Sequence, residues 1–132
     1  MQKRSQIIVL WLMTMGGFAC HTIMDLLPLF WNQSIAIDNS GTVPQPMLLM
    51  MATLSLLLPA CGIFCLLPTQ PKRWLLWVNT VIASIIGLFN IAHAFKELPS
   101  ENAAQYIIMP LMIVIGVCLA WKSWQLLRVK TT

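Results

Sequence analysis

Charged side chains are scarce in this chain of 132 residues: they make up 9% of it, with eight lysines and arginines and four acidic residues. Ordinary soluble domains carry roughly 25% charged residues. Hydrophobic residues, in contrast, account for 58% of the chain. A soluble globule of this size could neither bury that much apolar surface nor cover itself with so few charges. The composition also excludes an intrinsically disordered chain, which would be polar and charged.

Two further signals are missing. The net charge is +4, but the basic residues do not gather into a stripe, so we expect no nucleic-acid partner. None of the four cysteines lies in a predicted loop, which excludes an exported disulfide framework. No pair of them has the Cys-x-x-Cys spacing, which argues against a quinone-linked disulfide-forming enzyme. The cysteines are Cys20, Cys61, Cys65 and Cys118.

What the sequence does contain is long uncharged runs, at 5–24, 39–71, 74–95 and 102–121. About 20 apolar residues in a helix are enough to cross a bilayer. These runs do not alternate between polar and apolar residues, so they indicate helices rather than barrel strands. The sequence therefore predicts an all-α polytopic membrane protein, one domain over 1–132, with four transmembrane helices in an up-down bundle. The predicted spans are 7–29, 47–67, 74–95 and 106–124.

The basic residues predict the orientation. Seven of the eight flank the spans on one side, which should be the cytoplasm. Both termini would then be cytoplasmic, in a cell inner (plasma) membrane. A cleavable signal peptide over 1–20 is the competing interpretation, but the apolar stretch continues through Trp31 and is too long for one. The seven residues are Lys3, Arg4, Lys72, Arg73, Lys122, Arg128 and Lys130.

A short pattern occurs twice. Asp25 follows His21 by four residues and Glu97 follows His93 by four, and in each case a leucine follows the acid and a proline comes soon after. The repetition suggests a duplicated two-helix hairpin, although chance similarity between apolar helices is an alternative. Because the first and third spans run in the same direction, both pairs should lie near the outer membrane face.

Residues four apart share one face of a helix, so each histidine lies above its acid. On the third span Asn79, Ala83 and Asn90 continue this face. A polar stripe on a membrane helix faces protein or a water-filled cavity rather than lipid. We therefore expect the two stripes to face each other and to form a ligand-binding site. The predicted site residues are His21, Asp25, Asn90, His93 and Glu97.

Several chemistries suit such a site. Imidazole with carboxylate binds divalent metal ions, which makes His21, Asp25, His93 and Glu97 a candidate metal set. The two histidines could instead clamp a haem, or methionines such as Met47, Met50 and Met109 could add the thioethers that bind copper. The alternatives are a structural or assembly subunit with a membrane-protein partner or in a homo-oligomer, and an enzyme using histidine and carboxylate on a lipid-soluble substrate. In every case the lipid bilayer is a partner.

Two prolines lie inside predicted spans. Pro59 and Pro110 each remove a helix hydrogen bond, and each can kink its helix. Such kinks could open a cavity near the polar stripe, and the alternative is that both prolines only serve helix packing.

Overall fold

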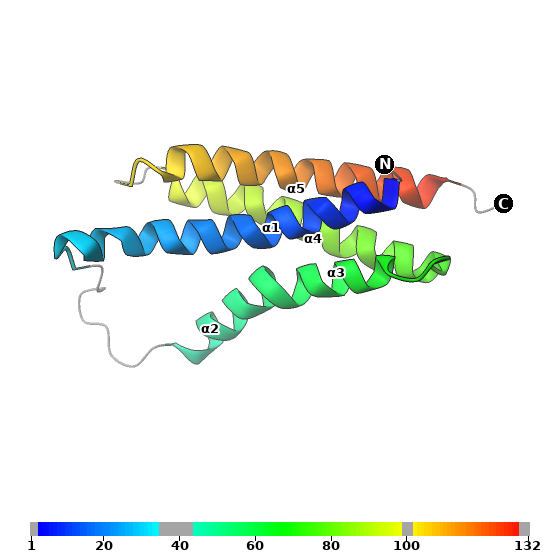
Figure 1. Cartoon of the computed structure of the whole chain (residues 1–132), viewed down its shortest axis with the longest axis horizontal. Coiled ribbons are helices and arrows are strands. Elements are labelled where there is room, and N and C mark those ends of the chain that lie inside the picture. The colour runs from blue at the N-terminus through cyan, green and yellow to red at the C-terminus, as the bar shows by residue number, and fades with distance from the viewer. Residues whose placement is uncertain (1–2, 35–43, 99–101, 130–132) are drawn as a thin grey trace.

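The computed structural model describes residues 3–34, 44–98 and 102–129, and all regular structure within them is helical. Figure 1 shows the helices in one bundle. The elements are α1 (Lys3–Leu26), the 3-10 turn η1 (Leu27–Trp31), α2 (Gln45–Ala52), the π-helical turn η2 (Thr53–Leu57), α3 (Leu58–Leu66), α4 (Arg73–Glu97) and α5 (Gln105–Arg128). The predicted all-α class is confirmed.

These elements form four spans that are long and apolar enough to cross a membrane: Lys3–Trp31, Gln45–Leu66, Arg73–Glu97 and Gln105–Arg128. Each predicted boundary lies within four residues of the observed one. Consecutive spans run in opposite directions, so the start of α1 and the end of α5 lie at the same end of the bundle (Figure 1). The up-down topology is therefore confirmed, whereas the duplication of a hairpin stays a prediction.

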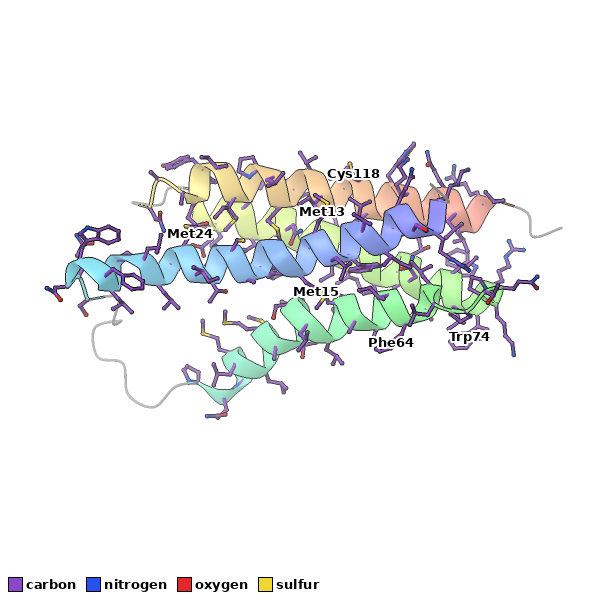
Figure 2. All side chains as sticks on the ribbon, viewed as in Figure 1. Met13, Met15, Met24, Phe64, Trp74 and Cys118 are labelled. Carbon is purple, nitrogen blue, oxygen red and sulfur yellow. The ribbon has the colours of Figure 1, made fainter. Side chains whose placement is uncertain are left out.

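The outer surface of the bundle is apolar. Phe64 and Cys118 point away from the neighbouring helices in Figure 2, and Phe64 is 67% exposed. Leu88, Phe95 and Ile107 are exposed to a similar or greater extent. Large apolar side chains on the outside of a helical bundle are suited to lipid rather than to water.

A buried polar chain joins three helices toward the end of the bundle at which α1 begins and α5 ends. Nε1 of Trp11 on α1 donates to Oδ1 of Asn79 on α4 at 2.9 Å, and Nδ2 of Asn79 donates to Oγ of Ser123 on α5 at 3.0 Å. Trp11 is 0% exposed and Asn79 is 1% exposed. An unpaired amide in hydrocarbon would cost several kcal/mol, so this chain of bonds fixes how the three helices face one another.

The second span is bent next to Pro59. This residue has no N–H to donate to the carbonyl of Ser55, and the π-helical turn η2 immediately precedes α3. α2 diverges from α1 in Figure 1, and every residue from Pro44 to Ala52 is exposed. The expected kink at Pro59 is thus present, whereas α5 continues through Pro110 without interruption.

Two glycines offer a test of the packing between α1 and α3. A Cβ atom added at Gly62 would overlap with the indole of Trp11, whereas one added at Gly16 would meet nothing within 4 Å. We expect Gly62→Ala to destabilise the protein by about 1–3 kcal/mol, as overpacking of a fixed core does. Gly16→Ala should leave stability unchanged or raise it slightly, because alanine favours helix.

Unfolding of the detergent-solubilised protein by heat or by sodium dodecyl sulfate measures both variants. Equal stabilities of Gly62→Ala and Gly16→Ala would contradict the described packing of Trp11 on α3.

Candidate functional site

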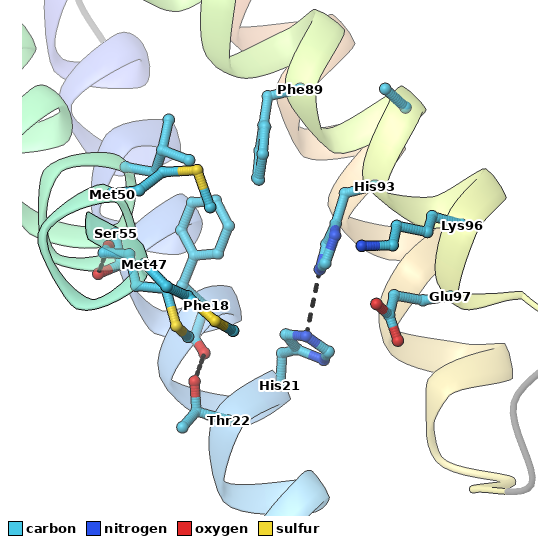
Figure 3. A pocket seen from close by; sticks show the side chains of 13 residues that line it. Phe18, His21, Thr22, Met47, Met50, Ser55, Phe89, His93, Lys96 and Glu97 are labelled. Atoms are coloured by element: carbon cyan, nitrogen blue, oxygen red, sulfur yellow. Dashed lines mark hydrogen bonds between the residues drawn. The ribbon is translucent and has the colours of Figure 1, made fainter. Parts of the chain in front are cut away.

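The two histidines of the chain meet between α1 and α4. Nε2 of His21 lies 3.3 Å from Nε2 of His93, and the ring centroids are 5.3 Å apart with an interplanar angle of 80°. Figure 3 shows the two rings pointing toward each other, edge to face. The prediction that the polar faces of the first and third spans face each other is confirmed at this point.

Gln105, the first residue of α5, holds His21 in place. Its side chain is 1% exposed; Nε2 donates to Oδ1 of Asp25, and Oε1 lies 2.9 Å from Nδ1 of His21. A carboxylate only accepts hydrogen bonds, so the amide nitrogen must face Asp25 and the amide oxygen must face His21. Nδ1 of His21 therefore carries a proton and donates it to Gln105. Oδ2 of Asp25 also lies 3.5 Å from Nε2 of His21.

This arrangement fixes the chemistry of the two facing nitrogens. Two bare Nε2 lone pairs at 3.3 Å would repel each other, so one proton must lie between them. The ring of His93 also stacks on Phe89, with centroids 5.3 Å apart and an interplanar angle of 13°. Both imidazoles are therefore held in orientation by neighbours other than each other.

The histidine pair forms part of the wall of a cavity of about 380 Å³. The cavity lies where α2 and η2 diverge from α1, and its wall is mainly apolar (Figure 3). Phe18 of α1 and Phe89 of α4 line it together with the methionines of α2, which are Met47, Met50 and Met51. Lys96 and Glu97 supply its charged groups. The bend before Pro59 thus creates a space whose wall is mainly apolar and whose titratable groups are the two histidines, Lys96 and Glu97.

The predicted site residues fall into three groups. His21, His93 and Glu97 line the cavity. Asp25 is not part of the cavity wall, but its Oδ1 accepts a hydrogen bond from Gln105 and its Oδ2 lies 3.5 Å from Nε2 of His21. Asn90 is outside this cavity: its amide is 2% exposed, and Nδ2 donates to the backbone oxygen of Met112 at 3.0 Å. The hydrogen bond to α5 fits the interhelical role that amides play in membrane helices.

A haem does not fit between these histidines. The porphyrin plane would have to lie between two Nε2 atoms that are in direct contact at 3.3 Å. Among the residues that the structure describes, no group of three or more His, Cys, Asp or Glu side chains is arranged to hold a metal ion. A metal site here therefore needs at least one donor of another type beside the imidazoles.

Sequence reasoning did not identify Gln105. The signal was present, because a glutamine opens the last apolar run at the membrane end where both histidine pairs were expected. Comparison of the chain with models of known protein families, with curated proteins and with solved structures finds no match.

The role of Gln105 can be tested with a matched pair of variants on α5. Gln105→Leu leaves Nδ1 of His21 without its acceptor, so we expect a loss of about 1–3 kcal/mol in unfolding free energy. Gln125→Leu changes a half-buried glutamine near the other end of the same helix and should have a smaller effect.

In nitrogen-15 spectra of histidine-labelled protein, wild type and Gln125→Leu should show His21 with a protonated Nδ1, and Gln105→Leu should lose this preference. An unchanged His21 signal in Gln105→Leu would show that the glutamine does not set the proton position.

Proposed function

We propose that this protein binds a metal ion within the membrane and that the imidazoles of His21 and His93 are its ligands. The observation that carries the proposal is the 3.3 Å separation of the two Nε2 atoms. Two nitrogens bound to one ion, each at about 2.0–2.1 Å, stand 3.3 Å apart when the angle at the metal is about 104–111°. This angle is close to the tetrahedral value.

The surroundings of His21 support the same proposal. Metal-binding histidines commonly donate their second ring N–H to a carboxylate or a carbonyl, which orients the ring and raises its basicity. His21 donates Nδ1–H to the carbonyl of Gln105, and Gln105 in turn donates to Asp25. The proton between the two Nε2 atoms must move to Nδ1 of His93 or leave the site before an ion binds both nitrogens.

The carboxylates then take different roles from those predicted from the sequence. In this proposal Asp25 acts through Gln105 as an outer-shell partner, since its Oδ1 already accepts from the amide. Glu97 lines the cavity of about 380 Å³ beside His93 and is available to a ligand there. The four residues of the predicted metal set thus divide into two ligands and two supporting groups.

Removal of either imidazole tests the metal function. We expect His21→Ala and His93→Ala to weaken binding of Zn(II) or Cu(I) by at least about 100-fold, more than the loss of a typical outer-shell partner. Thr22→Ala, a change in an exposed neighbour of His21, is the matched control and should keep wild-type affinity.

Titration of purified protein in detergent with each ion, in competition with a chromophoric chelator, measures the affinities. Wild-type affinity in the double histidine variant, or no binding of either ion by the wild type, would remove the proposed function.

A second candidate function follows from the volume of the cavity that both histidines line. A space of about 380 Å³ is far larger than a metal ion needs, and it lies at the lower end of the range of small-molecule sites. Its wall is apolar except for the two histidines, Lys96 and Glu97 and two hydroxyl residues. It therefore suits a small amphiphile whose polar group is hydrogen-bonded by imidazole.

Filling the cavity tests this candidate. Ala92 lines the cavity, so Ala92→Trp should expel a bound amphiphile, whereas Ala52→Trp on the exposed face of α2 should not. Mass spectrometry of the intact protein with its retained lipids should show fewer bound molecules for Ala92→Trp alone. Equal retention by the two variants would contradict amphiphile binding in this cavity.

The orientation proposed from the basic residues places the site on the outer side of a cell inner membrane. Arg4 donates to the carbonyl oxygens of Pro68 and Thr69 at 2.6 and 2.8 Å, which puts it in the same turn region as Lys72, at the end of α3. The histidine site lies toward the other end of α1. An assembly subunit and an enzyme for a lipid-soluble substrate stay predictions from the sequence.

A further inference from the structure

Both histidines also line a second, much smaller void, between α1, α4 and α5. Its volume is about 10 Å³, roughly the space that one water molecule or one ion occupies. The residues around it are Phe18, His21, Asn90, His93, Met109 and Met112. The void therefore has two histidines, two methionines and an asparagine in its wall, around a space for a single ion.

The histidine and methionine side chains around this void offer donor atoms that carry no charge. Imidazole nitrogen and thioether sulfur are uncharged. No carboxylate is among the residues that line the void, and among the described residues the carboxylate nearest to the ligand nitrogens is that of Asp25, whose Oδ2 lies 3.5 Å from Nε2 of His21. Thioethers are soft ligands that select Cu(I), whereas zinc sites use thiolate, imidazole and carboxylate. An uncharged donor set also leaves a monovalent ion with a smaller net charge to bury than a divalent ion would have.

We propose that the ion is Cu(I), bound by His21 and His93 together with the sulfur atoms of Met109 and Met112. The proposal rests on the metal-binding function proposed above and adds the identity of the ion and of its remaining ligands. It also accounts for the need for a donor other than His, Cys, Asp or Glu among the described residues.

Packing fixes the two methionines at the void. Met109 and Met112 are 2% and 4% exposed and lie three residues apart on α5, hence on one face. The sulfur of Met112 lies so close to Gly17 that a Cβ atom added there would overlap with it. Asn90 holds the backbone of the same residue through its bond to the Met112 carbonyl. In contrast, Met47, Met50 and Met51 are exposed on α2.

These two groups of methionines give a matched experiment. Leucine replaces methionine with little change in volume, so Met109→Leu with Met112→Leu removes both sulfurs at small cost in stability. We expect this double variant to lose at least tenfold in Cu(I) affinity, measured under ascorbate against bathocuproine disulfonate, and to keep its Zn(II) affinity. The control, with Met47→Leu, Met50→Leu and Met51→Leu, should bind Cu(I) as the wild type does.

X-ray absorption of the Cu(I)-loaded wild type provides a readout that does not depend on any variant. The proposal requires both nitrogen and sulfur neighbours at the copper, and a shell of nitrogen and oxygen alone would overturn it. Unchanged Cu(I) affinity in the Met109 and Met112 double variant, or an equal loss in the α2 control, would overturn it too. Histidine-dependent Zn(II) binding in those cases would leave the metal function intact, whereas no binding of either ion would remove both.

Discussion

Polar groups inside a bilayer must find partners within the protein, and this constraint sets both the packing and the site. Three amides, all on α4 or α5, meet it by bonding across the bundle. Asn79 links α1, α4 and α5, and Asn90 links α4 to the backbone of α5. Gln105 links α5 to two side chains of α1, Asp25 and His21. Among the described residues, no buried side-chain polar atom is left without a hydrogen-bond partner.

Of these amides, only Gln105 is hydrogen-bonded to a side chain, the imidazole of His21, that can bind a ligand or exchange a proton. The bonds of Asn79 and Asn90 end in a hydroxyl and a backbone carbonyl, which makes them structural. The bonds of Gln105 end in an imidazole whose other nitrogen faces a second imidazole across 3.3 Å. That pair lines both the larger cavity and the water-sized void. A ligand in either space would therefore change the protonation or position of the same two rings.

The fold was predictable because it depends on a few strong signals. Missing charges define the spans, and a rotation of about 100° per residue puts His21 over Asp25 and His93 on the same face as Asn90. Because the first and third spans are parallel, the two histidines had to lie at the same depth. None of these inferences requires knowledge of the packing between helices.

The remaining parts of the site depend on that packing. Gln105 could be recognised as polar, but its partners follow only from how α5 lies on α1. The cavity depends on the direction that α2 takes before Pro59, and a proline alone does not fix it, as the continuous helix through Pro110 shows. The same holds for Met112, which reaches the void only because Gly17 leaves space on α1.

The contact between the two imidazoles is the central claim, and the chain offers a direct measurement because it contains only two histidines. Nitrogen-15 correlation spectroscopy of histidine-labelled protein in bilayers detects close pairs of ring nitrogens without ambiguity of assignment. We expect a correlation between the two Nε2 signals, because the two atoms are 3.3 Å apart. Two isolated ring systems with no correlation between them would contradict it.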